Sequence, residues 1–207
     1  MPVYDEIKAK SVKGYLPDSH KKLSGSLKEY LFYIKQANEC GGPILELACG
    51  AARIMMVLAE AGFETYGLDM SPYMLKIGQQ AIKNWLKPET QKRIHLIRAD
   101  MRNFAFKRKF PLIIIPYISF WYNLDEMGAE NCLKCVIEHL DQNGKFIIDT
   151  PKVEYVEEWW KEMSVKYKFR YQLFKVYDYY KDYDSKDWGP WTRESLSILI
   201  IQKQSSN

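Results

Sequence analysis

The 207-residue sequence has no long apolar run, few cysteines and few histidines. Its longest apolar stretches, around Leu112–Tyr117 and Ile198–Ile201, are far shorter than the roughly 20 residues that span a bilayer, which argues against a membrane protein. The first residues include Asp5, Glu6 and Lys8 instead of an apolar signal segment, so we expect a cytoplasmic protein. Four cysteines are too few to predict a disulfide framework in a chain of this length.

The sequence also lacks a strong charge imbalance, because it contains 30 Lys and Arg residues and 26 Asp and Glu residues. A net charge of +4 permits an acidic partner without demanding nucleic acid. The Lys and Arg alternation in residues 165–170 favours one solvated strand face over a nucleic-acid groove. Cys132 and Cys135 form a C-x-x-C spacing without a second pair, which favours packing on one helix face, and we expect no metal.

The hydrophobic fraction of 47% is sufficient for a sizeable core, and the length suits one domain with a small appendage. We divide the chain into an N-terminal helical arm (1–41), a ligand-binding core (42–150) and a C-terminal helix with antiparallel strands (151–207). The arm contains Tyr4, Tyr15 and His20, which are candidates for a lid over the site.

The stretch Pro43–Met70 organises the core. It predicts a buried strand (Ile44–Ala48), a turn of small residues (Cys49–Ala52) and a helix (Arg53–Ala61). A second strand (Phe63–Leu68) follows and ends at an acid, Asp69. Small residues let the backbone and a ligand approach closely, and an acid at the second strand end can accept hydrogen bonds from ribose hydroxyls. The arrangement therefore suits a ligand that contains adenosine.

The rest of the core alternates helices and strands. Helices are expected at 24–38, 71–86 (with Ser71 as N-cap) and 125–140, and strands at 93–98, 110–117 and 145–149. A helix at 154–163 and strands at 165–180 and 191–203 follow, and the two strands should pair antiparallel. The predicted fold class is α/β: a Rossmann-like, doubly wound, mostly parallel sheet flanked by helices, with a C-terminal antiparallel strand pair.

Four motifs in this order resemble those of the class I S-adenosylmethionine-dependent methyltransferases. They are E-L-A-C-G-A-A-R (46–53), G-L-D-M-S (67–71), R-A-D-M-R-N-F (98–104), and an apolar strand followed by L-x-x-N-G-K-F-I-I-D (140–149). The resemblance covers about residues 42–150, roughly half of the chain. It implies S-adenosylmethionine as cofactor and S-adenosylhomocysteine as product.

The resemblance also implies site residues. Glu46 would orient the turn or hold the methionine ammonium, Asp69 would bind the ribose, and Asp100 would face the adenine amino group. The full cofactor-binding set is Glu46, Ala48, Cys49, Gly50, Arg53, Asp69, Met70, Asp100, Met101 and Pro116. The candidate acceptor-side residues are Tyr117, Ser119, Tyr122, Asn123 and Tyr15, and no catalytic residue is assigned.

Two departures from the family pattern bear on function. Ala52 stands where the family usually has a glycine, and its methyl group fits without strain only if φ is negative, so cofactor affinity could be weakened. The two C-terminal strands either close the sheet or form an inserted hairpin of a chain that stops early. We favour closure, because an open edge after the fifth strand would be prone to aggregation.

The favoured function is methyl transfer to a nitrogen or oxygen of a small-molecule acceptor. The alternatives are an RNA or protein methyltransferase, and a catalytically silent domain that binds the cofactor or activates a partner. A nicotinamide-dependent reductase fits poorly because G-x-G-x-x-G is absent. The Tyr and Trp richness of residues 155–191 would cover an aromatic acceptor or form a self-association surface, which leaves a homodimer open.

Overall fold

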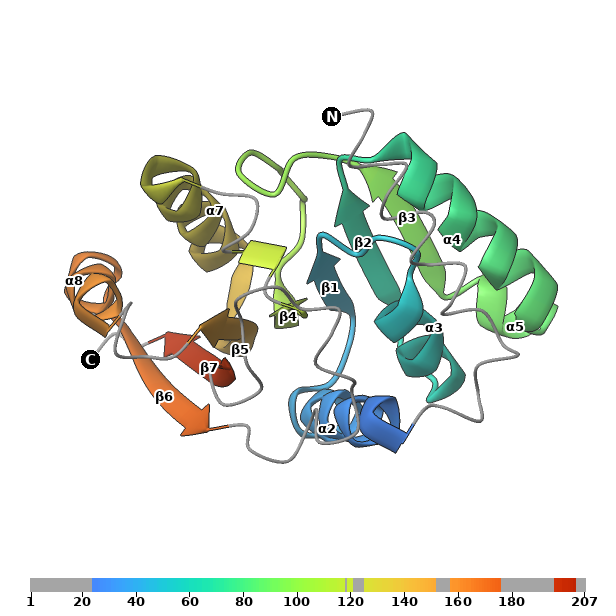
Figure 1. Ribbon diagram of the computed structural model, residues 1–207, viewed down its shortest axis with the longest axis horizontal. Coiled ribbons are helices and arrows are strands. Elements are labelled where there is room, and N and C mark those ends of the chain that lie inside the picture. Colours follow the sequence, from blue (N-terminus) through green and yellow to red (C-terminus); the bar gives the residue numbers. More distant parts are fainter. Residues whose placement is uncertain (1–23, 118, 121–124, 152–156, 176–195, 204–207) are drawn as a thin grey trace, which may run out of the picture.

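A computed structural model describes residues 24–117, 119–120, 125–151, 157–175 and 196–203. Its centre is one seven-stranded sheet with the order β3-β2-β1-β4-β5-β7-β6 (Figure 1). Neighbours in the first five strands are parallel, and β7 and β6 are antiparallel to the strands beside them. The predicted α/β class with a Rossmann-like, mostly parallel sheet is confirmed.

The five parallel strands lie within a few residues of the predicted ones. They are β1 (Ile44–Leu47), β2 (Thr65–Asp69), β3 (Ile94–Arg98), β4 (Phe110–Ile115) and β5 (Leu140–Pro151). The chain order reverses between β1 and β4, so β1 pairs with β2 on one side and with β4 on the other. Ligands of open α/β sheets bind beyond the carboxyl ends of the strands at such a reversal point. The arrowheads of β1 and β2 in Figure 1 mark that edge.

The C-terminal strands close the sheet, as expected. β7 (Leu196–Lys203) pairs with β5, with Ile147 opposite Ile200, and β6 (Phe169–Lys175) pairs with β7. The prediction of a strand from residue 165 is wrong, because helix α8 (Glu157–Tyr167) continues through this stretch. Lys166 and Tyr167 both hydrogen-bond the carboxylate of Glu130 on helix α7 (Glu126–His139), which holds the last turn of α8 in place. The apolar alternation there reflects no sheet face, since Val165 is 80% exposed.

Helices cover both faces of the sheet. One face packs against α2 (Ser24–Cys40), α3 (Arg53–Glu60) and α4 (Pro72–Trp85), with the short α5 (Pro88–Gln91) beside them. As predicted, Ser71 caps α4 by accepting a hydrogen bond from the Met74 backbone N–H, and Pro72 occupies the first helical position. The other face packs against α7 and α8.

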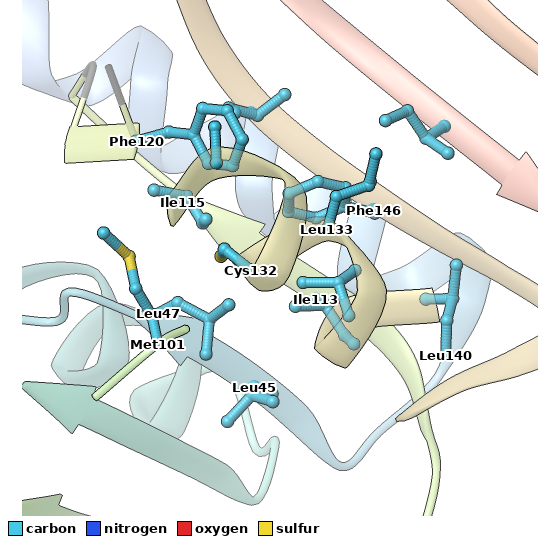
Figure 2. Close-up of a cluster of buried hydrophobic side chains, with 14 of the residues drawn as sticks. Leu45, Leu47, Met101, Ile113, Ile115, Phe120, Cys132, Leu133, Leu140 and Phe146 are labelled. Atoms are coloured by element: carbon cyan, nitrogen blue, oxygen red, sulfur yellow. The ribbon is translucent and has the colours of Figure 1, made fainter. Parts of the chain in front are cut away.

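The larger part of the core lies under α7 and α8 (Figure 2). Alternate residues of each parallel strand point to this face, and α7 contributes side chains three and four positions apart. The central members are Leu45, Leu47, Ile113, Ile115, Phe120, Cys132, Leu133 and Phe146. The chain crosses from β3 to β4 without a helix, and Met101 and Phe104 of this connection fill the space beside the sheet. Among the described residues, no helix is long and apolar enough to cross a membrane.

Candidate functional site

The turn after β1 has a left-handed backbone at three positions. φ is +55° at Ala48, +54° at Gly50 and +64° at Ala52. An L-residue in this conformation costs about 1–2 kcal/mol, so the two alanines strain the turn. The condition for an unstrained alanine at position 52 is therefore not met. The Ala52 methyl group is fully buried in the cluster that contains Cys49, Met55 and Leu75, so it does not project from the turn into solvent.

Close packing behind the turn depends on Gly67 of β2. A Cβ atom at this position would clash with Met55 Sδ and would lie 2.8 Å from Cys49 Sγ. The glycine thus lets α3 and the turn pack directly against β2. Cys49 is buried there, and its backbone N–H donates to the Leu68 carbonyl at 3.0 Å.

Asp69, at the end of β2, connects the turn to the start of α4. Its Oδ2 accepts a hydrogen bond from the Gly50 N–H and its Oδ1 accepts one from the Ser71 N–H, each at 2.8 Å. These charge-assisted bonds fix both the carboxylate and the turn. The next residue, Met70, leaves 44% of its surface exposed at the same edge of the sheet.

Glu46 lies beneath the turn, as the last residue but one of β1, and is only 4% exposed. Burial raises the pKa of this carboxyl to about 8; Arg53 opposes the rise, while Glu29 and Asp69 add to it. Its buried Oε2 has no hydrogen-bond partner among the described residues. A buried acceptor without a donor is costly, and a cationic ligand group would satisfy it.

Arg53, at the start of α3, pairs with Glu29 of α2. The guanidinium Nη1 and Nη2 atoms lie 2.6 and 2.8 Å from the two carboxylate oxygens of Glu29. Burial acts to lower the pKa of Arg53, but the Glu29 carboxylate outweighs it and raises the pKa above its ordinary value. Sequence analysis missed Glu29, because no local spacing signals a partner 24 positions away.

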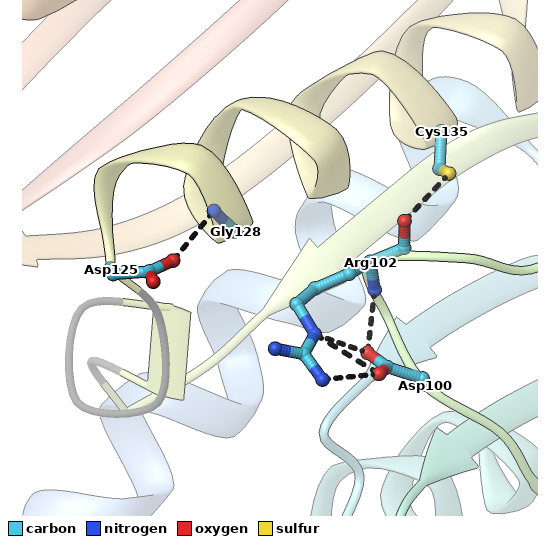
Figure 3. A network of polar contacts seen from close by, with 5 residues as sticks. All are labelled: Asp100, Arg102, Asp125, Gly128 and Cys135. Atoms are coloured by element: carbon cyan, nitrogen blue, oxygen red, sulfur yellow. Dashed lines mark hydrogen bonds and ion pairs between the residues drawn. The ribbon is translucent and has the colours of Figure 1, made fainter.

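Asp100 and Met101 follow β3. Figure 3 shows Asp100 beside its partner Arg102. Arg102 binds the Asp100 carboxylate with two nitrogens, Nη2 at 2.7 Å and Nε at 3.0 Å, and with its backbone N–H at 2.9 Å. These hydrogen bonds lower the pKa of Asp100. The Met101 side chain is buried in the core. Sequence analysis did not anticipate the partnership of Asp100 with Arg102.

The cofactor candidate Pro116 and the acceptor-side candidate Tyr117 follow β4. Pro116 is buried, and Tyr117 has a left-handed backbone with φ of +66°. The Tyr117 N–H donates to Oδ2 of Asp149, a buried acid at the end of β5. The Asp149 Oδ1 accepts a long hydrogen bond of 3.5 Å from the hydroxyl of Tyr33 on α2. Sequence analysis assigned no role to Asp149 or Tyr33.

Ser119 is half-buried after Tyr117. The remaining acceptor-side candidates, Tyr15, Tyr122 and Asn123, lie outside the described residues, as do the lid candidates Tyr4 and His20. The described site therefore has two parts. The strained turn, Glu46, Asp69 and Asp100 lie at the ends of β1 to β3, and Tyr117 and Asp149 lie at the ends of β4 and β5.

Comparisons with known proteins relate about half of the chain to methyltransferases. Residues 44–144 match the family model described as a methyltransferase domain. The YqeM protein of Bacillus subtilis (strain 168), which carries a provisional methyltransferase name, is 33% identical over 109 residues. That match spans 52% of this chain and 42% of the relative.

Solved structures resemble the chain over a larger share. A TehB-like S-adenosylmethionine-dependent methyltransferase from Corynebacterium glutamicum has a TM-score of 0.68 at 16% identity, over 99% of this chain and 100% of that one. The glycopeptide N-methyltransferase MtfA in complex with S-adenosylmethionine has a TM-score of 0.68 at 17% identity, over 85% and 93% of the chains. At these identities the structures show that the fold is shared.

Proposed function

We propose that this protein is a class I S-adenosylmethionine-dependent methyltransferase that methylates a nitrogen or oxygen atom of a small molecule. The match of residues 44–144 to a methyltransferase-domain family supports the proposal. S-Adenosylhomocysteine would be the second product. One observation carries the proposal: Glu46, Asp69 and the turn between them combine a buried acceptor, a fixed carboxylate and a close backbone approach at one strand edge. These features match the ammonium, the ribose and the chain that joins them in S-adenosylmethionine.

The residues present fit this cofactor. The unpartnered Oε2 of Glu46 would accept from the methionine ammonium, and Asp69 would accept from the ribose hydroxyls. Gly50 has no side chain on the turn, and a Cβ atom there would lie 3.3 Å from Met74 Cε, so the glycine keeps this part of the turn narrow. Asp100 and the backbone of Met101 would meet the adenine, and the exposed Met70 side chain would cover it.

S-Adenosylmethionine supplies a methyl carbon that its sulfonium already activates. The protein therefore mainly needs to align the acceptor and exclude water. Tyr117 and Ser119 follow β4, which pairs with β1, and we infer that the acceptor approaches from there. A general base is required only if the acceptor arrives protonated, so a site without an evident base is compatible with this chemistry.

A small-molecule acceptor is supported by the neighbours. MtfA is a glycopeptide N-methyltransferase, and its fold covers 85% of this chain. Residues 165–170, where alternating Lys and Arg raise the alternative of a nucleic-acid groove, do not form one continuous strand face, because residues 165–167 end helix α8. These observations favour a small acceptor over RNA.

Calorimetry with S-adenosylmethionine tests the cofactor assignment. We expect binding by the wild type and a loss of about 10²-fold or more in Asp69→Ala, since charge-assisted hydrogen bonds of about 1.5–3 kcal/mol each are removed. Asp69→Asn retains one acceptor oxygen and should lose less, and circular dichroism should show both variants folded. Absence of binding by the wild type would refute the enzyme assignment, and wild-type affinity in Asp69→Ala would refute the ribose assignment.

The acceptor class is tested with S-adenosylmethionine that carries a labelled methyl group. The protein is incubated with a panel of small amines, phenols and alcohols, and in parallel with total RNA and with denatured protein. We expect label in one or more small molecules. Label only in RNA or protein would refute the small-molecule proposal and support the alternative methyltransferase classes.

A further inference from the structure

A buried carboxylate lies at the acceptor edge of the sheet, where packing alone would favour an apolar residue. Asp149 ends an apolar run in β5, after Phe146, Ile147 and Ile148, and is 4% exposed. Burying a charge is expensive unless hydrogen bonds compensate it. The buried Asp149 carboxylate therefore needs groups that bind and compensate it.

One of these groups is the backbone of Tyr117. Its N–H donates to the Asp149 Oδ2 across 32 positions of sequence. Tyr117 is left-handed, with φ of +66°, which is uncommon for a bulky residue and costs about 1–2 kcal/mol. A charge-assisted hydrogen bond is worth about 1.5–3 kcal/mol, enough to offset that strain. Asp149 thus accounts for a backbone conformation that Tyr117 alone would not favour.

The second group is the phenol of Tyr33. This residue lies on α2, is 1% exposed, and donates to the other carboxylate oxygen of Asp149 at 3.5 Å. Burial, and then the Asp149 charge, raises the pKa of Tyr33, so the phenol keeps its proton and remains a donor. One turn earlier on α2, Glu29 holds Arg53 beside the cofactor turn. One face of α2 is therefore connected to both parts of the site.

We propose that Asp149 is a positioning residue that fixes the left-handed backbone at Tyr117 and, through Tyr33, locks the exit of β4 to helix α2. This arrangement sets where the acceptor-side residues lie relative to the methyl group. The consequence for methyl transfer rests on the proposed function, whereas the backbone contact does not. Asp149 is not expected to touch the cofactor, so its loss should separate binding from transfer.

The backbone contact is tested by nuclear magnetic resonance of the full chain. In the wild type, the Tyr117 amide should be shifted downfield and protected from exchange. In Asp149→Ala, we expect it to move upfield and to exchange about 10- to 100-fold faster, the equivalent of one lost charge-assisted hydrogen bond. Asp149→Asn should retain most of the protection, because its side-chain oxygen still accepts. Asp141→Ala, at the start of the same strand, is the matched control and should leave this amide unchanged.

The functional consequence is tested with S-adenosylmethionine and an amine or phenol that the wild type methylates. Asp149→Ala should bind S-adenosylmethionine within about threefold of the wild type, while methyl transfer falls by about 10²-fold, as small misplacements of reacting groups do. Asp149→Asn should restore transfer to within about tenfold. Tyr33→Phe should lower transfer less than Asp149→Ala, because the Tyr117 contact remains.

Three results would overturn the proposal. They are an unchanged Tyr117 amide in Asp149→Ala, a loss of cofactor affinity as large as in Asp69→Ala, and equal inactivity of the Asn and Ala variants. A wild type that binds no S-adenosylmethionine would overturn the proposed function instead, and the amide experiment would still decide whether Asp149 holds Tyr117.

Discussion

The two parts of the site are built by different means. At the cofactor side, the acid, the turn and the next helix are joined by short-range contacts: Asp69 binds Gly50, 19 positions away, and Ser71, two positions away. At the acceptor side, Asp149 binds Tyr117 across 32 positions and Tyr33 across 116. Apart from the pair of Arg53 with Glu29, contacts within one stretch of the chain thus specify the first part, whereas packing between distant elements specifies the second.

The difference follows from the chemistry. A cofactor of constant shape can be held by backbone groups and one acid whose spacing along the chain stays the same. An acceptor has to be placed against the methyl group by residues from several elements, and loops carry such residues. Helix α2 joins the two parts, because it contacts Arg53 through Glu29 and Asp149 through Tyr33.

The largest effect on stability is expected from Glu29→Gln, which breaks the ion pair between α2 and Arg53 at the cofactor side. This variant leaves the charged Arg53 beside a neutral side chain. Breaking a buried pair costs about 3–5 kcal/mol, and because Arg53 is a quarter exposed we expect about 2–3 kcal/mol in the free energy of unfolding by urea. Glu39→Gln, on the same helix but in an exposed pair with Lys145, is the control and should cost less than about 1 kcal/mol. Equal losses in the two variants would show that α2 is not anchored through Arg53.

Sequence reasoning correctly predicted the features that local sequence patterns determine. The strands, the Ser71 cap and the acid at the end of β2 follow from hydrophobic periodicity and from the small-residue turn. It placed the start of strand β6 too early, at residue 165, because the alternating residues 165–167 are equally compatible with an exposed helix end. The start of β6 is marked by Lys168, whose left-handed φ of +52° no glycine or proline announces.

Long-range pairs could not be predicted in the same way. Glu29 and Tyr33 lie one turn apart on α2, and nothing in their spacing tells which buried charge each would meet. Asp149 ends a motif that matches the family, but the motif does not contain its partner. The acceptor part of the site became visible only when β4, β5 and α2 were placed together.

A pH experiment tests the cofactor side alone, because the pKa of Glu46 beneath the turn makes stability depend on pH. The pKa of Glu46 in the folded protein is about 8, above the ordinary value of 4.5, so folding retains a proton that the unfolded chain has lost. The stability that Glu46 contributes is therefore complete below about pH 4.5 and is lost as the pH rises through about 8. In the absence of cofactor, the free energy of unfolding should fall over this window, and Glu46→Gln should flatten the dependence.

Cofactor binding should oppose this loss, because an ammonium beside Glu46 favours the ionised acid. Calorimetry at pH 7 in two buffers of different ionisation enthalpy should show proton release in the wild type and less in Glu46→Gln. Affinity in Glu46→Gln should be lower than in the wild type by about tenfold at pH 8, a difference of about 1.4 kcal/mol. Glu60→Gln, an exposed acid at the end of α3, is the control, and identical proton release in all three proteins would contradict the ammonium contact.

The smallest effect is expected at Ala52, the departure that raised doubt about cofactor binding. Ala52→Gly relieves about 1–2 kcal/mol of left-handed strain. It also adds about 0.5–1 kcal/mol of chain entropy cost and removes a buried methyl worth about 0.8 kcal/mol, so the free energy of unfolding should change by less than about 1 kcal/mol. Ala51→Gly is the matched control: φ is not positive there, no strain is relieved, and we expect a loss of about 0.5–1 kcal/mol. The Ala52 methyl points into the core, so its removal should leave S-adenosylmethionine affinity within about threefold of the wild type. A tenfold gain in affinity, about 1.4 kcal/mol, would show that this alanine weakens cofactor binding.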